Sequence, residues 1–171
     1  MKIAILGYSG SGKSTLAKFL GETYKIPVLH LDTVQFIEDW EERNYEEGLA
    51  IVAKMMAEDN WVIDGNYTKF YQAERLAAAD QIIFVQFSRW ATLKRILQRR
   101  IKYHKQSRPD MAEGCYEKLD WEFLWWVVYE GRTKERREHY QAIEQGYAEK
   151  CLTIKNQKEL DAFYQRTLKP S

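Results

Sequence analysis

The chain carries a glycine-rich segment near its start that few folds can accommodate. Residues 3–6, with the sequence IAIL, form an apolar run of strand length, and GYSGSGKST follows at residues 7–15. A helical pattern then extends from Thr15 to Tyr24. The order of strand, G-x-x-x-x-G-K-S loop and helix is the context of a phosphate-binding P-loop. We therefore expect this segment to bind the phosphates of a nucleoside triphosphate.

The residue types in this loop suit phosphate binding. Glycines at positions 7, 10 and 12 permit backbone angles and close approach that a Cβ would obstruct, so that backbone N–H groups can turn onto the phosphates. Lys13 would reach the β- and γ-phosphates, and the Ser14 hydroxyl would ligate Mg²⁺ directly. The predicted nucleotide-binding residues are Gly7, Ser9, Gly10, Ser11, Gly12, Lys13, Ser14 and Thr15.

The bulk properties of the chain fit one ordinary globular domain. Its 171 residues are 45% hydrophobic and 30% charged, with a formal net charge of +1 at pH 7. That charge gives no global field for attracting nucleic acid. No apolar run reaches membrane-spanning length, and the first residues enter a strand pattern rather than a signal peptide. Cys115 and Cys151 are far apart in the sequence, which favours a reduced, cytoplasmic setting.

Short apolar segments alternate with helical patterns along the chain. Strands are predicted at residues 2–6, 28–31, 61–64, 81–87 and 151–154, and helices near 13–24, 45–58, 68–78, 89–103, 119–146 and 157–167. Such alternation predicts an α/β fold in which helices cover both faces of a parallel sheet. Ligands in this architecture bind beyond the carboxyl ends of the strands. Residues at those ends are therefore the candidates for chemistry.

Two carboxylates follow consecutive predicted strands, at the edge where the P-loop is expected. Asp32 follows the strand VLHL, and Asp64 follows the residues WVI and opens the turn DGNY. Either aspartate alone could be a turn former or a helix cap. Their joint placement beside a P-loop favours a role in chemistry. His30, within the first of these strands, is interpreted as a core histidine rather than a catalyst.

At these positions the chain resembles the adenylate-kinase-like branch of P-loop kinases, and within it the DNA topology modulation (FlaR-like) proteins. The resemblance rests on GYSGSGKST at 7–15, LHLD at 29–32, WVIDGNY at 61–67 and a basic segment at 93–123 that in such kinases leads into a mobile lid. It implies a P-loop NTPase three-layer sandwich with a five-stranded parallel sheet in the order 2-3-1-4-5. It also implies a single domain over residues 1–171, with an acceptor-binding region at about 32–60 and a helical lid at about 100–136.

The resemblance gives the two carboxylates different roles. Asp64 matches the aspartate of the family's Asp-Gly turn and would hold Mg²⁺ through water, since Mg²⁺ keeps several water ligands. The fourth strand leads to Gln86 where many relatives have an aspartate, so Gln86 is given no metal role. Asp32 lies where shikimate and gluconate kinases place an aspartate, and it would either take the proton of an acceptor hydroxyl or only bind the substrate. The predicted acceptor site comprises Asp32, Phe36, Asp64, Gly65, Asn66 and Tyr67.

A run of basic residues lies on or after the helix predicted at 89–103, where Arg95 and Arg99 share one face. In relatives an arginine at the base of the lid reaches the nucleotide phosphates, and Arg99 is the best match. Arg132 and Arg136, on the far side of the lid, are candidates to close on the same phosphates, because a planar guanidinium binds two phosphate oxygens and keeps its proton. The alternative is a solvated basic helix face. The predicted catalytic residues are Lys13, Asp32, Arg99, Arg132 and Arg136.

Together these features predict an ATP-dependent phosphotransferase that moves the γ-phosphate of Mg·ATP to a nucleotide, a nucleoside or a small hydroxylated acceptor. The expected cofactors are ATP and Mg²⁺. The alternative function is that of a regulatory, nucleic-acid-associated protein that binds ATP and contacts DNA through residues 94–108. The net charge and the lack of a helix-turn-helix or zinc-finger signature argue against it. The sequence leaves open which acceptor is used and whether the chain is a monomer or a dimer.

Overall fold

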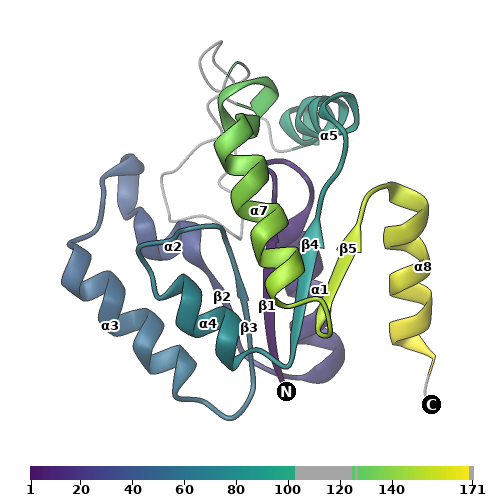
Figure 1. Cartoon of the computed structure of the whole chain (residues 1–171). Helices are drawn as coiled ribbons and strands as arrows, with labels where there is room; N and C mark the ends of the chain where they lie inside the picture. The colour runs from purple at the N-terminus through teal and green to yellow at the C-terminus, as the bar shows by residue number, and fades with distance from the viewer. Residues whose placement is uncertain (103–124, 126, 170–171) are drawn as a thin grey trace.

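The fold is built on one parallel sheet of five strands. The computed structural model of the protein describes residues 1–102, 125 and 127–169, with the side chains of residues 99–102 excepted. Strand β1 (Lys2–Gly7) lies at the centre of the sheet, with β3 (Trp61–Asp64) and β2 (Val28–His30) on one side and β4 (Gln81–Val85) and β5 (Cys151–Ile154) on the other (Figure 1). The order β2-β3-β1-β4-β5 confirms the predicted α/β fold of the P-loop NTPase type.

The central strand is buried on both faces, which explains why its sequence is almost wholly apolar. Ala4 and Leu6 of β1 belong to one hydrophobic core, whereas Ile3 and Ile5 belong to the core on the opposite face. The strands pair in register, with Ile5 beside Asp64 of β3. Because all the strands are parallel, their carboxyl ends form one edge of the sheet, and Asp64 lies at that edge.

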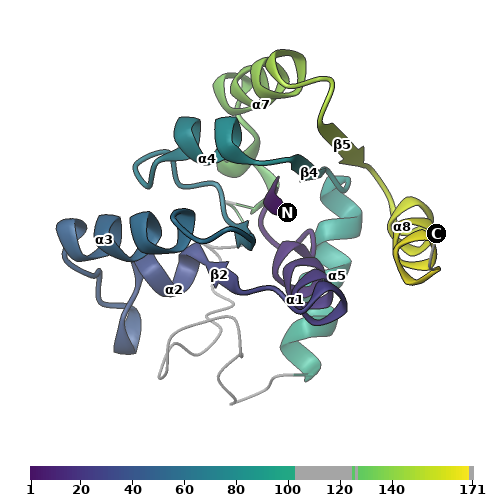
Figure 2. The same cartoon turned by 90° about the horizontal axis from the view of Figure 1, so that it is seen from below.

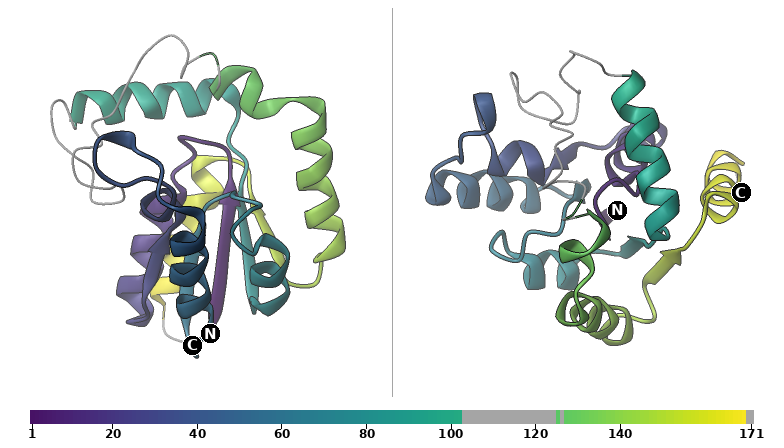
Figure 3. Two further views of the ribbon diagram at one scale, coloured as in Figure 1. Left: turned by 90° about the vertical axis from the view of Figure 1, so that its left-hand side faces the viewer. Right: turned by 90° about the horizontal axis from the view of Figure 1, so that it is seen from above.

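Helices cover both faces of the sheet (Figure 2). Helices α1 (Lys13–Tyr24) and α8 (Gln157–Leu168) pack on one face. Helices α3 (Tyr45–Met56), α4 (Gln72–Ala78) and α7 (Lys134–Gly146) pack on the other. Helix α5 (Arg89–Lys102) crosses above the carboxyl ends of the strands, as Figure 3 shows. Shorter helical turns complete the chain: α2 (Leu31–Gln35), η1 (Glu38–Trp40) and η2 (Glu130–Arg132).

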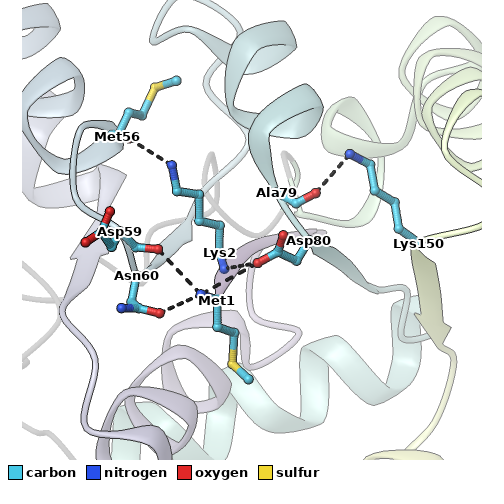
Figure 4. A network of polar contacts seen from close by, with 8 residues as sticks. All are labelled: Met1, Lys2, Met56, Asp59, Asn60, Ala79, Asp80 and Lys150. Carbon is cyan, nitrogen blue, oxygen red and sulfur yellow. Dashed lines mark hydrogen bonds and ion pairs between the residues drawn. The ribbon is translucent and has the colours of Figure 1, made fainter.

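Polar contacts close the opposite, amino edge of the sheet (Figure 4). The amino group of Met1 donates to Asn60 Oδ1 at 2.5 Å and lies 3.7 Å from the Asp80 carboxylate. Lys150, at the start of β5, donates to the carbonyl of Ala79 at 2.9 Å, near the end of α4. These contacts hold the loops at the amino edge, so the carboxyl edge is the one left for a ligand site.

Two predicted elements near the site end earlier than the sequence pattern suggests. The strand predicted at 28–31 ends at His30, because Leu31 begins α2 and the N–H of Phe36 closes that turn on the carbonyl of Asp32 at 3.0 Å. Asp32 therefore lies in the first turn of a short helix. The strand predicted at 81–87 ends at Val85, where its neighbour β1 also ends.

Two of the predicted helices begin later than the sequence pattern suggests, whereas the helix predicted at 13–24 has the same bounds in the structure. The helix predicted at 68–78 begins only at Gln72, since Tyr71 has a left-handed backbone with φ of +51°. In the described part of the helix predicted at 119–146, the turn η2 precedes α7, and the Thr133 hydroxyl caps α7 by accepting the N–H of Arg136. Residues 103–124 and 126 of the predicted lid lie outside the described residues. None of the helices described could span a membrane.

Candidate active site

The P-loop connects the carboxyl end of β1 to the first turn of α1. At Gly7 the backbone has φ of +144°, and a Cβ would lie 2.2 Å from the carbonyl oxygen of Val85, so only glycine fits there. The carbonyl of Tyr8 accepts hydrogen bonds from the N–H of Ser11 and from the Lys13 ammonium, both at 3.2 Å. Helix α1 begins at Lys13, so its amino end and this ammonium both supply positive charge at the loop.

The predicted P-loop residues differ in burial. Ser11 is fully buried, and its hydroxyl oxygen has no hydrogen-bond partner among the described residues. Thr15 is exposed on α1, on the side away from the sheet. The remaining residues of the loop beyond Gly7 are half-buried: Ser9, Gly10, Gly12, Lys13 and Ser14. Most residues of the loop are therefore partly accessible to solvent, whereas Gly7 and Ser11 are buried beneath them.

Asp64 connects the P-loop with the edge strand β2. It ends β3, is 4% exposed, and accepts a hydrogen bond from the Ser14 hydroxyl with 3.0 Å between Oγ and Oδ2. Its other oxygen, Oδ1, is in close contact with Nδ1 of His30, the last residue of β2. His30 is half-buried rather than part of the core, which corrects its interpretation as a core histidine. Three polar groups from β2, β3 and α1 thus form one connected row.

Ser14 and Asp64 fit a Mg²⁺ site that takes its other ligands from phosphates and water. Mg²⁺ prefers oxygen ligands, usually keeps several waters and is commonly held by one or two protein groups beside substrate phosphates. The described part of the chain contains no group of three or more His, Cys, Asp and Glu residues that could hold a metal alone. A hydroxyl and a buried carboxylate 3.0 Å apart meet this need. Direct ligation by Ser14 and water-mediated ligation by Asp64 stay predictions.

The turn after β3 anchors the start of the P-loop. The side-chain amide of Asn66 bonds both backbone groups of Gly7, accepting its N–H at 3.0 Å and donating to its carbonyl at 2.7 Å. The N–H of Gly65 donates to the carbonyl of Ile5 at 3.1 Å. Gly65 and Asn66 therefore fix the end of β1, and their predicted contact with an acceptor stays a prediction.

Asp32 and Tyr67 form a polar pair on the acceptor side. The Tyr67 hydroxyl donates to Asp32 Oδ1 at 2.8 Å. Burial, followed by the nearby carboxylates of Asp32, Glu42 and Asp64, raises the pKa of Tyr67 well above its ordinary value, so this hydroxyl stays a donor at neutral pH. Among the described residues, Tyr67 is the one side chain that bonds the Asp32 carboxylate. Oδ2 of Asp32 can therefore accept from another donor.

The loop after α2 encloses the acceptor side and is rich in carboxylates. Phe36 forms an isolated bridge with Glu42, and its ring meets that of Trp40 edge to face with 5.3 Å between centroids. Arg43 anchors the loop through its Nε, which donates to the carbonyl of Val34 at 3.1 Å. Four exposed carboxylates line the loop: Glu38, Asp39, Glu41 and Glu42. The arginine of this segment is thus engaged by backbone, while its acidic groups face solvent.

Arg95 of α5 lies directly against the P-loop, although sequence reasoning preferred Arg99. Its Nη1 donates to the carbonyl of Ser11 at 2.9 Å, and its Nη2 donates to Oε1 of Gln157 at 2.6 Å. A Cβ at Gly12 would lie 2.7 Å from the same Nη1. Burial lowers the pKa of Arg95. Helical spacing places Arg95 and Arg99 on one face of the predicted helix, and the contact with the P-loop is described for Arg95, since the side chain of Arg99 lies outside the described residues.

Of the predicted lid arginines Arg99 and Arg132, the structure describes the side chain of Arg132. The side chain of Arg99 lies outside the described residues. Arg132 is buried, and its Nη2 donates to the Phe87 carbonyl at 2.8 Å and to the Thr92 hydroxyl at 3.0 Å. Its guanidinium carbon lies 3.9 Å from the ring centroid of Tyr8 in the P-loop. Burial lowers the pKa of Arg132. Arg132 is therefore at the nucleotide side of the site, held in place by α5 and the end of β4.

Arg136 lies one turn into α7, on an exposed part of that helix. Its side chain hydrogen-bonds the hydroxyl of Tyr140, whose pKa is raised by burial. The Tyr140 ring in turn meets the Tyr8 ring edge to face, with 5.6 Å between centroids. The helix after the predicted lid thus contacts the P-loop through Tyr140, and Arg136 stands at the outer end of this contact.

Comparison with known proteins supports a kinase fold. No family model matches the sequence. The chain is 28% identical to adenylate kinase of Clostridium kluyveri, in a match that covers 67% of this chain and 69% of the relative. A gluconokinase from Sinorhizobium meliloti has a similar structure, with a TM-score of 0.56, 15% identity, and coverage of 98% of this chain and 89% of that chain.

Shikimate kinase from Aquifex aeolicus is similar too, with a TM-score of 0.50, 16% identity, and coverage of 98% of this chain and 94% of that chain. Because the sequence identity to both structures is low, the similarity establishes a shared fold and no more. The parallel sheet in the order β2-β3-β1-β4-β5 and the P-loop after its central strand define a P-loop NTPase α/β fold, which these kinase structures share.

Proposed function

We propose that this chain is an ATP-dependent phosphotransferase that moves the γ-phosphate of Mg·ATP to a hydroxyl group of a small acceptor. One observation carries the proposal. The Asp32 carboxylate, with one oxygen bonded to Tyr67, stands beyond the same sheet edge as Lys13 and the Ser14–Asp64 pair. A phosphate-binding loop and a carboxylate that can receive a proton are the two parts that such a transfer requires.

In the proposed reaction, the acceptor oxygen attacks the γ-phosphorus while Asp32 Oδ2 takes the hydroxyl proton. The new O–P bond forms as the bond from the γ-phosphorus to the bridging oxygen breaks, and ADP leaves with that electron pair. Lys13 stabilises the negative charge that develops on the phosphates. Mg²⁺, when bound beside Ser14, would neutralise phosphate charge. Tyr67 orients the Asp32 carboxyl group, because its hydroxyl donates to Oδ1 and leaves Oδ2 toward the acceptor.

The charges of the acceptor side support a hydroxyl acceptor over a phosphate acceptor. An acceptor phosphate is already an anionic nucleophile and needs no base, so Asp32 would oppose it rather than help it. The exposed loop carboxylates from Glu38 to Glu42 add negative charge on this side. Arg43, the cation nearest in sequence, donates to the backbone carbonyls of Thr33 and Val34. A nucleoside or a polyol suits these surroundings better than a nucleoside monophosphate.

The finer parts of the proposal rest on sequence. We assign the acceptor region to residues 32–60 and the lid to 100–136, with Arg99, Arg132 and Arg136 as candidates to reach the phosphates. The assignment to the DNA topology modulation (FlaR-like) proteins rests on GYSGSGKST, LHLD and WVIDGNY. Within that assignment, transfer to a small hydroxylated molecule in the cytoplasm is the activity that we propose.

A screen of matched acceptors tests the proposal. ADP release from Mg·ATP would be measured with pairs that differ by one anionic group, such as adenosine with AMP and sorbitol with gluconate. We expect Lys13-dependent ADP release with at least one neutral hydroxylated acceptor. Faster release with the anionic member of each pair, insensitive to Asp32→Asn, would contradict the proposed acceptor chemistry. Absence of stimulated release with every acceptor, although ATP binds, would contradict a kinase function.

A further inference from the structure

His30 stands at the outer end of the polar row that reaches the P-loop. It ends the three-residue strand β2, and its Cα pairs in register with that of Asp64 at the end of β3. The imidazole Nδ1 is in close contact with Asp64 Oδ1. The side chain of His30 is 18% exposed, whereas that of Asp64 is 4% exposed. The imidazole therefore contacts a nearly buried carboxylate while it is itself partly exposed to solvent.

The proton positions in this row follow from its chemistry. An ionised carboxylate is an acceptor only, so Nδ1 of His30 must carry the hydrogen that it shares with Asp64. By the same argument the Ser14 hydroxyl gives its proton to Oδ2, 3.0 Å away. A hydroxyl that donates in this way keeps its lone pairs for a cation. Asp64 thus sets the direction in which Ser14 can ligate a metal.

We propose that His30 is a positioning residue for the Mg·ATP site. Its Nδ1–H fixes the orientation of the Asp64 carboxylate, and the carboxylate in turn orients the Ser14 hydroxyl toward the metal. This inference rests on the proposed function, since it assumes that Mg·ATP binds at the P-loop. Outer hydrogen-bond partners of this kind commonly change metal affinity by about 10- to 100-fold when they are removed.

Three substitutions separate the position of the N–H donor from the mere presence of a side chain. His30→Asn keeps an N–H donor at the same distance from Cβ as Nδ1. His30→Gln moves that donor outward by one carbon, and His30→Leu removes it. The readout is the Mg²⁺ concentration that gives half-maximal binding of a fluorescent ATP analogue, measured by titration without any acceptor. Binding in EDTA and the melting temperature are measured on the same samples.

We expect His30→Leu and His30→Gln to raise the required Mg²⁺ concentration by about tenfold. His30→Asn should stay within about threefold of the wild type, and binding in EDTA should change in none of the variants. Equal behaviour of His30→Asn and His30→Gln would overturn the inference, as would a parallel loss of binding in EDTA. The Asn and Gln variants are both polar and decide the question even if His30→Leu does not fold.

A double substitution tests whether His30 acts on the metal site through Asp64 and Ser14. If His30 acts through Asp64 on Ser14, the effect of His30→Gln on the Mg²⁺ requirement should largely vanish in a Ser14→Ala background. Full additivity would count against the inference. Mg²⁺-dependent ATP binding by the wild type with unchanged His30 variants would refute the role of His30 alone. Lack of any Mg·ATP binding by the wild type would instead refute the proposed function.

Discussion

The donor and acceptor sides of the site are built with different degrees of constraint. Three side chains, two from the end of β3 and the turn after it and one from α5, hold the P-loop: Asn66 bonds Gly7, Asp64 bonds Ser14, and Arg95 bonds Ser11. On the acceptor side, Asp32 has one side-chain bond within the described residues, to Tyr67. The donor side is therefore shaped before any ligand arrives, while the acceptor side retains an oxygen and an acidic loop for a partner.

Because the two sides differ in constraint, we expect them to control different properties of the reaction: the donor side its rate, and the acceptor side its selectivity. A preorganised phosphate site serves the same nucleotide in every turnover, so changes there should affect transfer to all acceptors alike. The acceptor side determines which hydroxyl reaches the phosphorus, so changes there should depend on the acceptor offered. Substitutions on the two sides can therefore be compared through their effect on acceptor selectivity as well as on rate.

The largest effect is expected for Lys13→Ala. Removal of the ammonium should lower phosphoryl transfer by about 10³-fold or more with every acceptor, because the developing phosphate charge loses its main protein cation. Lys13 is half-buried at the first position of α1, so the melting temperature should change little. ADP release and thermal melting measure the two quantities. Lys18→Ala, an exposed lysine of the same helix, is the matched control. Transfer that persists in Lys13→Ala would remove the P-loop from the reaction.

Asp32→Asn should have the next largest effect, and an acceptor-dependent one. Loss of a general base costs about 10²- to 10⁴-fold in kcat for a hydroxyl acceptor. The KM for ATP should stay near its wild-type value, because Asp32 follows β2, which β3 separates from the strand that leads into the P-loop. Glu42→Gln, an exposed acidic neighbour in the acceptor loop, should change kcat by no more than a few-fold. An Asp32→Asn effect below a few-fold would exclude a catalytic role for Asp32.

Arg95→Met should have a smaller effect, confined to the donor side. The substitution removes the charge-assisted bonds to the Ser11 carbonyl and to Gln157. Such bonds are worth about 1.5–3 kcal/mol, so the KM for ATP should rise by about tenfold or more. Selectivity between acceptors should not change. Lys94→Met alters an exposed neighbour and is the control. A change in acceptor preference in Arg95→Met would mean that the two sides are not independent.

Much of the fold and the donor site follows from local sequence signals. The P-loop motif, the apolar strands and their alternation with helices predict a parallel α/β sheet, and the resemblance to P-loop kinases implies its strand order; the structure confirms both. The same signals predict that Asp64 lies at the carboxyl edge near Ser14, and the two are in contact. These features depend on spacing within short segments, which a single sequence displays directly.

Features that depend on packing between distant segments are not visible in the sequence. The contact of Arg95 with Ser11, 84 positions earlier in the chain, follows from the way α5 crosses above the carboxyl edge of the sheet. The contact of His30 with Asp64 follows from the β2–β3 register. Leu31 begins a helix where the apolar run predicts a strand, because the turn closes on the Asp32 carbonyl. The first two features depend on tertiary contacts, whereas the start of α2 at Leu31 depends on a local turn that the apolar run does not reveal.

The smallest effect is expected for Tyr67→Phe, through the pH dependence of stability. Burial, and then Asp32, raises the pKa of Tyr67 above the ordinary value of 10.0. The folded protein therefore keeps this proton at a pH where the unfolded chain releases it. The resulting stabilisation is fully present below that ordinary value and is lost as pH rises above it, by about 1.4 kcal/mol per pH unit for one proton.

Tyr67→Phe lacks this term and should be less stable than the wild type at neutral pH by about 1 kcal/mol, the worth of a typical hydrogen bond. Above pH of about 10 its unfolding free energy should fall less steeply, so the two curves converge. Urea unfolding at a series of pH values measures both curves. Tyr24→Phe, at an exposed tyrosine, should run parallel to the wild type. Parallel curves for Tyr67→Phe and the wild type would mean that Tyr67 has the same pKa in the folded and unfolded states. That result would contradict a fixed hydrogen bond from the Tyr67 hydroxyl to Asp32.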